Sequence, residues 1–177
     1  MKICIYGSGS RKIDKTYTDE AYALGCEIAR HNHTLVFGGG NTGIMGSCAR
    51  GVLDNNGKIL GIAPKWIGNF EPLCDECSEF IYVETMDERK TGFLNNSDAF
   101  IVCPGGIGTL DEFFEIITLK KLKQHDKTVI VFNTNHFYDK MIEMLHQMHD
   151  EGLIRENVLD IFVVADSIDG VLEYIKD

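Results

Sequence analysis

The segment best equipped for chemistry is a glycine-rich loop that runs into an acidic stretch, Pro104 to Glu112 (PGGIGTLDE). An apolar run precedes it and an amphipathic run follows it, which predicts a buried strand, a tight loop and a helix. Glycines let the backbone approach a ligand closely, and the free N–H groups at a helix start, together with the helix dipole, attract an anion. The segment therefore predicts a phosphate site with the Glu112 carboxylate beside it.

The same residues also fit a purely structural motif. Thr109 and Glu112 have the T-x-x-E spacing of a capping box, in which the glutamate reaches back to cap the start of the helix. In that interpretation Glu112 takes no part in chemistry. The glycine loop in front of it favours the functional interpretation, but the spacing alone leaves both open.

A second glycine loop, 38–46 (GGGNTGIMG), follows the apolar run at 34–37. Gly38, Gly40 and Gly43 satisfy G-x-G-x-x-G, which by itself is a weak indication of dinucleotide binding. The acid that would hold the ribose of NAD about 20 residues later is missing from 59–64, and no G-x-x-x-x-G-K-[ST] motif occurs. The loop therefore predicts phosphate contact without NAD and without a P-loop ATPase.

Apolar strand-like runs alternate with amphipathic helical runs along the chain. Continuous Val/Ile-rich strands are typical of a parallel sheet covered on both faces, and such sheets bind ligands beyond the carboxyl ends of their strands. Both glycine loops fall at such ends. We predict one α/β domain over 1–177, with a loop over 64–78, strands near 2–6, 34–37, 58–63, 80–83, 98–103, 128–132 and 161–164, and helices near 14–31, 47–55, 86–96, 109–123, 137–151 and 167–175.

Two apolar helix faces are predicted from the same periodicity. The helix over 137–151 is expected to turn Met141, Met144, Leu145 and Met148 inward. The helix predicted over 109–123 carries Phe113, Phe114 and Ile117, an apolar arc wide enough to suggest a subunit interface as well as a core.

Composition excludes several classes of protein. The chain has 17 Lys and Arg against 27 Asp and Glu, and its net charge of −10 opposes nucleic-acid binding. No apolar run approaches membrane length, and the strand-like start leaves no room for a signal peptide, so we expect a cytoplasmic protein that binds no membrane and keeps its thiols reduced. Cys74 and Cys77 form the one close cysteine pair, and without further ligands no metal site is expected.

Three motifs together resemble those of the LONELY GUY family. Pro104 to Glu112 matches P-G-G-x-G-T-x-x-E, and its companions are Met86-x-x-Arg89-Lys90 and the glycine loop 38–46. The resemblance extends over nearly the whole chain, through 125–127 and 151–154. Members of this family are phosphoribohydrolases that release the base from cytokinin riboside 5′-monophosphates. Bacterial relatives have been labelled lysine decarboxylases, but this chain has no evident lysine signature for pyridoxal phosphate.

The resemblance implies a Rossmann-like, doubly wound, mostly parallel sheet, a homodimer, and a small nucleoside monophosphate such as AMP as substrate, with no cofactor. It also implies that Arg89 and Glu112 are catalytic. The substrate-binding residues that it implies are Gly39, Gly43, Met86, Lys90, Gly105, Gly106, Gly108 and Thr109.

Two positions depart from the family pattern. Asp87 stands where the family usually has His, and Leu119 follows Thr118 where the family often has Trp. Both changes bear on the base pocket. The sequence therefore does not decide between a prenylated adenine and plain adenine.

Cleavage of an N-glycosidic bond needs the chemistry that these residues offer. The sugar gains oxocarbenium character, so the Glu112 carboxylate can stabilise it, hold the ribose hydroxyls or orient the attacking water. Arg89 can stabilise the departing base by charge and hydrogen bonds, with Lys90 assisting or contacting phosphate. We expect Glu115 to support Glu112 from the next turn and Asp111 to interact with the helix dipole.

A different class of function fits the same scaffold. In a nucleotide carrier or molybdenum-cofactor carrier, the loops bind phosphate and nothing is cleaved. The pair of Arg89 and Glu112 favours the enzyme, because charged groups that shift each other's pKa values in a cleft more often serve catalysis than binding alone. A nucleic-acid-sensing module is a third interpretation, which the net charge of −10 opposes.

Overall fold

One parallel sheet organises the chain, which the computed structural model describes for residues 1–154 and 160–175. Its seven strands follow the order β4-β3-β2-β1-β5-β6-β7, and each neighbouring pair runs parallel. The order reverses between β1 and β5, which is therefore the switch point of a doubly wound sheet. This confirms the predicted α/β, Rossmann-like fold. The strands are β1 (Lys2–Tyr6), β2 (Thr34–Phe37), β3 (Lys58–Pro64), β4 (Glu79–Val83), β5 (Ala99–Val102), β6 (Thr128–Phe132) and β7 (Val163–Ala165).

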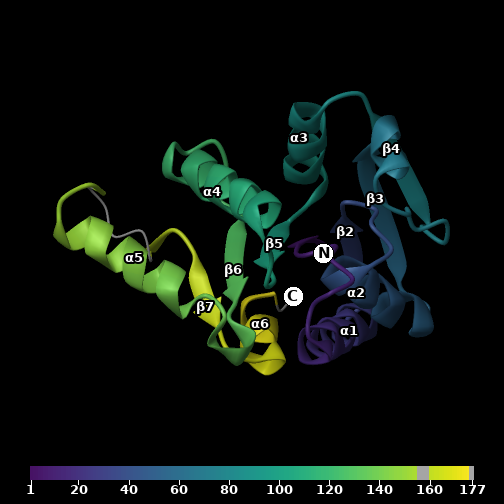
Figure 1. The fold of residues 1–177 in the computed structure, drawn as a ribbon, viewed down its shortest axis with the longest axis horizontal. Coiled ribbons are helices and arrows are strands. Elements are labelled where there is room, and N and C mark those ends of the chain that lie inside the picture. Colours follow the sequence, from purple (N-terminus) through teal and green to yellow (C-terminus); the bar gives the residue numbers. More distant parts are fainter. Residues whose placement is uncertain (155–159, 176–177) are drawn as a thin grey trace.

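Helices cover both faces of the sheet (Figure 1). One face carries α1 (Lys15–Arg30), α2 (Gly43–Asp54) and α6 (Ile168–Tyr174), and the other carries α3 (Met86–Asn96), α4 (Ile107–Lys121) and α5 (Asp139–Asp150). Two short 3-10 helices, η1 (Lys65–Asn69) and η2 (Thr134–His136), follow β3 and β6. Within residues 1–154 and 160–175, no helix is long and apolar enough to cross a membrane.

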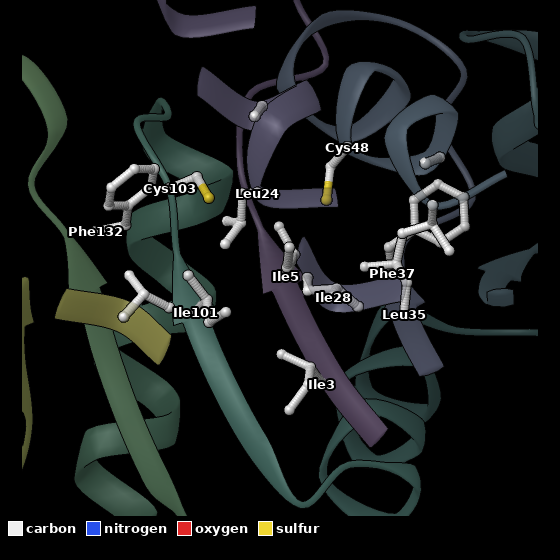
Figure 2. Packing of buried hydrophobic residues seen from close by; sticks show 14 of the residues in the cluster. Ile3, Ile5, Leu24, Ile28, Leu35, Phe37, Cys48, Ile101, Cys103 and Phe132 are labelled. Atoms are coloured by element: carbon white, nitrogen blue, oxygen red, sulfur yellow. The ribbon is translucent and has the colours of Figure 1, made fainter. Parts of the chain in front are cut away.

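Successive side chains of β1 enter opposite layers, as the two-residue period of a strand requires. Ile3 and Ile5 join the cluster that packs beneath α1 and α2, which Figure 2 shows. Cys4 and Tyr6 join the cluster beneath α3, α4 and α5. Because all four side chains are buried, β1 is clamped on both faces and its carboxyl end has a fixed position.

The loops that leave β1 and β5 are tied together at the switch point. The backbone N–H of Cys103 donates to Tyr6 O over 2.8 Å, and that of Ser8 donates to Pro104 O over 3.1 Å. The glycine-rich segment after β5 therefore begins against the turn after β1. This is the crevice in which open parallel sheets bind ligands.

The starts of two helices differ from the prediction. α2 begins at Gly43, inside the segment predicted as loop, and α4 begins at Ile107, two residues before Thr109. The predicted loop over 64–78 contains η1, and β7 begins two residues later than the strand expected at 161–164. The N-terminus of α1 is capped by Asp14, whose carboxylate accepts the Thr16 N–H over 2.8 Å.

The predicted apolar faces of α4 and α5 pack against the core, and only the inward position predicted for Met144 is wrong. Met144 on α5 is 41% exposed, because it lies at the edge of the inward stripe whose centre, Leu145, is buried. On α4, Phe113 and Ile117 are buried in the chain's own core and Phe114 packs against that core. The apolar arc of α4 therefore gives no support to a homodimer, which stays a prediction from the family resemblance.

Candidate active site

A cavity of about 510 Å³ lies at the carboxyl ends of the strands, bordered by the starts of α3 and α4, which Figure 1 shows on the same side of the sheet. Its volume is within the range of about 300 to 1,000 Å³ that is usual for small-molecule sites. Six of the predicted site residues line it: Met86, Arg89, Gly106, Gly108, Thr109 and Glu112. The other lining residues are Gly7, Ser8, Gly9, Met45, Trp66, Ile67, Phe70, Glu71 and Asp111.

The start of α4 presents free hydrogen-bond donors to this cavity. Its N-cap is Gly106, whose position offers no side-chain cap, and Leu110 N–H, which donates to Gly106 O over 3.0 Å, is the first intrahelical donor. The N–H groups of the three preceding residues have no intrahelical acceptor, and the positive end of the helix dipole lies at the same place. A Cβ added to Gly106 or Gly108 would meet open space. This part of the cavity is suited to an anion.

Glu112 does not cap α4, so the capping-box interpretation is wrong. Thr109 is the third residue of the helix and not its N-cap, and Gly106 has no side-chain cap. The Glu112 side chain is half-buried on the cavity wall, and this burial raises its pKa to about 7, against the opposing effect of the Arg89 charge. A carboxyl group with a pKa near neutrality beside a guanidinium is an arrangement typical of acid–base or electrostatic catalysis.

Arg89 is held in place by backbone carbonyls. Its side chain is only 6% exposed, and it donates from Nε to Ile62 O over 3.2 Å and from Nη2 to Gly38 O over 3.3 Å. A Cβ on Gly38 would lie 1.8 Å from Nη2, so glycine is needed there to make room for the guanidinium. Nη1 lies 3.8 Å from Met86 Sδ, a weak contact that leaves donors for a ligand in the cavity.

Lys90 turns away from the main cavity and joins α3 to α4. Its Nζ forms ion pairs with Glu115 and, over 3.3 Å, with Asp111. The hydrogen bond to Glu115 and the charges of both acids raise the pKa of Lys90, although partial burial opposes them. Asp111 is thus paired with Lys90, whereas the sequence predicts a role at the helix dipole. Glu115 is likewise paired with Lys90, and its predicted support of Glu112 stays a prediction.

The second glycine loop packs backbones together and contributes little to the cavity. Gly39 and Gly43, both in the described part of the chain, lie outside the cavity lining and have positive φ angles of 80° and 64°. A Cβ on Gly43 would lie 2.4 Å from Ser8 O, which itself accepts the Ile44 N–H over 2.8 Å at the start of α2. The carbonyl of Ser8 thus occupies the helix start where the G-x-G-x-x-G pattern suggested a phosphate.

Gly105 does not line the main cavity, although the next residue, Gly106, does. It lines a neighbouring cavity of about 240 Å³, which is bounded by Tyr17, Ile44 and Phe137 and shares Ser8 and Gly106 with the main one. A Cβ on Gly105 would lie 2.2 Å from Thr109 Oγ1, so the glycine lets Thr109 pack against the loop.

The two departures from the family pattern also lie off the main cavity. Asp87 is exposed on the first turn of α3 and does not line the cavity. Leu119 borders a small recess behind Glu112, together with Tyr6, Lys90 and Glu115. In the part of the chain that the structure describes, no group of three or more His, Cys, Asp and Glu side chains is arranged to hold a metal ion.

The segment after β3 contributes a wall that the sequence did not predict as part of the site. Trp66, Ile67, Phe70 and Glu71 line the cavity, although they fall in the stretch predicted as a loop. Phe70 is 81% exposed and its ring meets that of Trp66 edge-on at 6.1 Å. The sequence offered one indication of this wall, namely large aromatic residues in a predicted loop. Such residues are usually buried in a core, so their presence in a loop suggests a binding surface.

Comparisons with known proteins show which family the chain resembles. Residues 45–175 match the family model described as possible lysine decarboxylase. The chain is 34% identical over 176 residues to cytokinin riboside 5′-monophosphate phosphoribohydrolase LOG2 of Arabidopsis thaliana. The aligned region covers 99% of this chain and 83% of that protein. It is 32% identical to probable cytokinin riboside 5′-monophosphate phosphoribohydrolase LOGL2 of Oryza sativa subsp. japonica, over 99% of this chain and 72% of that protein.

A solved structure provides a comparison of another kind. The molybdenum cofactor binding protein from the phototrophic bacterium Rippkaea orientalis superposes with a TM-score of 0.74 at 26% identity, covering 98% of this chain and 94% of that one. The same scaffold thus occurs in proteins named for hydrolysis and in a protein named for binding.

Proposed function

The chain belongs to the family described as possible lysine decarboxylases, which includes the LONELY GUY phosphoribohydrolases, and we propose that it hydrolyses the N-glycosidic bond of nucleoside 5′-monophosphates. Water adds to C1′ of the ribose, the bond from C1′ to the base nitrogen breaks, and the proton lost by the water balances the one gained by the base. The products are the free base and ribose 5-phosphate. Cytokinin nucleotides are the substrates for which the relatives are named.

The observation that carries this proposal is the convergence of three groups in one cavity. The uncapped start of α4 supplies donors for the 5′-phosphate, Glu112 supplies a carboxyl group with a pKa near 7, and Arg89 supplies a fixed cation. Within residues 1–154 and 160–175, Glu112 caps no helix start and no side chain caps the start of α4. Each matches a demand of the reaction, because the phosphate needs an anchor and the ribosyl cation needs a negative charge.

Each group then has a distinct role. The start of α4 binds the phosphate and fixes the position of the ribose. The Glu112 carboxylate stabilises the developing positive charge and orients the attacking water. The remaining N–H groups of Arg89, which Ile62 O and Gly38 O hold in a fixed orientation, stabilise negative charge on the departing base. The substrate's phosphate thus provides binding energy that places C1′ between Glu112 and Arg89.

The test is release of free base, measured by chromatography, from AMP and from N6-isopentenyl-AMP. The wild-type protein is expected to release adenine or its prenylated derivative with equimolar ribose 5-phosphate. AMP is expected to bind much more tightly than adenosine, because the nucleoside brings no anion to the start of α4. Equal affinities for AMP and adenosine in calorimetry would contradict the phosphate site.

A carrier is the second candidate, and the likeness to the molybdenum cofactor binding protein favours it. A carrier binds its phosphate-bearing ligand at the same helix start and cleaves nothing. Tight binding of AMP with no release of base over prolonged incubation would favour the carrier. The same outcome would overturn the hydrolase.

A further inference from the structure

Glu71 is a second glutamate of the cavity, and neither the phosphate site nor the proposed chemistry uses it. It is half-buried and lines the cavity from the segment that follows η1. Within residues 1–154 and 160–175, its carboxylate has no hydrogen-bond or ion-pair partner. Because this carboxylate lines the cavity and is an acceptor only, a donor group of the cavity's occupant can reach it.

The backbone beside Glu71 is anchored by its surroundings. On one side Pro72 O accepts the Asn41 N–H over 2.9 Å, and Gly39 O accepts the Cys74 N–H over 2.8 Å. The carboxylate itself packs against glycine, since a Cβ added to Gly9 would lie 3.2 Å from Glu71 Oε2. The backbone next to Glu71 is therefore anchored, and the turn after β1 leaves room for its side chain.

The neighbours of Glu71 are suited to a flat ring. Trp66 and Phe70 precede it on the same segment, and Met45 approaches the same glycine, Gly9. Aromatic and thioether side chains make favourable contacts with flat heteroaromatic rings. A nucleotide whose phosphate lies at the start of α4, and whose ribose lies at Glu112, leaves its base for this remaining wall. The donor that a base can offer is an exocyclic amino group.

We propose that Glu71 is a specificity-determining residue that accepts a hydrogen bond from the 6-amino group of a purine base and so selects adenine nucleotides over 6-oxopurine nucleotides. The proposal rests on the proposed function, because it takes the cavity to be a nucleotide site. Adenine offers two N–H groups at this position and an N6-alkylated adenine offers one, so both satisfy Glu71. IMP presents a carbonyl oxygen there, which a carboxylate repels, and N6,N6-dimethyl-AMP presents no N–H at all.

The experiment measures the affinity of the wild type for four nucleotides by calorimetry: AMP, N6-isopentenyl-AMP, N6,N6-dimethyl-AMP and IMP. We expect the first two to bind roughly 10- to 100-fold more tightly than the last two, the usual range for a hydrogen bond to a charged group. This comparison needs no mutation. Equal affinities for AMP and N6,N6-dimethyl-AMP would overturn the proposal.

Variants assign the selectivity to the residue. Glu71→Gln is expected to weaken AMP binding about tenfold and to remove the preference over IMP, because the amide N–H can donate to O6 of hypoxanthine. The matched control is Glu76→Gln, an exposed position on the same segment outside the cavity. A loss that is equal for AMP and IMP, or that disappears with 2′-deoxy-AMP, would place Glu71 at the ribose and overturn the proposal.

Binding and hydrolysis separate the two proposals. If the wild type prefers AMP over IMP but cleaves neither, the hydrolase fails and the role of Glu71 stands. If it cleaves AMP and IMP equally well and binds them with equal affinity, the role of Glu71 fails and the hydrolase stands.

Discussion

The starts of α3 and α4 carry the same T-x-x-E spacing, both border the cavity, and the structure uses them in opposite ways. At α3, Thr85 Oγ1 accepts the Glu88 N–H over 3.1 Å, and Glu88 Oε2 accepts the Thr85 N–H over 3.2 Å, which completes a capping box. At α4, Thr109 and Glu112 form no cap, and the glutamate faces the cavity. The same four-residue pattern therefore has a structural use on one helix and a functional use on the other.

The position of the helix start decides between these uses. Thr85 stands just before α3, so its glutamate falls on the third helical residue and can reach back. The glycine loop lets α4 begin at Ile107, which moves Thr109 inside the helix and Glu112 beyond the reach of the N-cap. A self-capped α3 holds Arg89 firmly, whereas α4 keeps free donors and an unneutralised acid for a ligand. Sites of this kind give up local stability in favour of function.

The largest effect that distinguishes the two helices is expected in turnover. Glu112→Gln removes the charge that stabilises the ribosyl cation, so base release from AMP should fall on the order of 100-fold or more, as for other positioned acid–base groups. Glu88→Gln should leave turnover near the wild-type value, because a capping box tolerates Gln. Affinity for AMP should survive in both variants. Undiminished base release by Glu112→Gln would remove the functional half of the comparison.

Much of this could be read from the sequence, and the rest depends on tertiary packing. The alternation of strands and helices that defines the α/β fold follows from local pattern, and the grouping of Arg89 with Glu112 follows from the motifs. The T-x-x-E pairs could not be told apart, because nothing local fixes whether Gly106 or Thr109 is the N-cap of α4. Glu71 was missed because a loop residue shows its surroundings only after β1, β2 and β3 have come together.

The role of the glycine loop 38–46 also depends on tertiary packing. The sequence predicted phosphate contacts for the loop 38–46, but Gly38 makes room for Nη2 of Arg89, which is 51 residues away in the chain. No local pattern encodes a contact at that separation. Only the folded sheet reveals that the two glycine loops serve different purposes.

A smaller effect should follow from breaking the tie between the two helices. Lys90→Gln removes the cation that Asp111 and Glu115 share, and the loss of this coupling should lower kcat/KM for AMP by several-fold to about tenfold. The matched control is Lys65→Gln, which removes an exposed ion pair with Glu84 and should have little effect.

A charge exchange identifies the cause of that loss. Lys90→Glu combined with Glu115→Lys restores the pair and should recover part of the activity that Lys90→Glu alone loses. A defect confined to KM for phosphate-bearing substrates, with no recovery in the double variant, would instead support the phosphate contact that the sequence predicted for Lys90.

Thr85 and Thr109 should show a smaller contrast, in which one substitution lowers stability and the other lowers affinity for AMP. Thr85→Ala removes the N-cap of α3 and should lower the free energy of unfolding by about 1 kcal/mol without changing AMP affinity directly. Thr109→Ala removes no cap and should weaken AMP binding instead, because Thr109 lines the anion end of the cavity. Urea unfolding and calorimetry on both variants measure the two quantities. Equal loss of stability with unchanged AMP affinity in both variants would contradict the contrast.

The last contrast is in the pH dependence of stability, and its sign follows from Glu112. Burial raises the pKa of this carboxyl group from its ordinary value of 4.5 to about 7 in the folded protein, so between these values the native state holds a proton that the unfolded chain has lost. The contribution of Glu112 to stability is therefore complete below about pH 4.5 and is lost as the pH rises through 7. The Glu112→Gln variant has no titrating group at this position. The difference between its melting temperature and that of the wild type should therefore shift in favour of the variant as the pH rises from about 5 to 8. Glu88→Gln, which removes one charge from the start of α3 and keeps its cap, controls for general charge effects. A Glu112→Gln difference that stays constant over this range would show that the carboxyl group is solvated like an ordinary surface acid, and the contrast between the two helix starts would then rest on geometry alone.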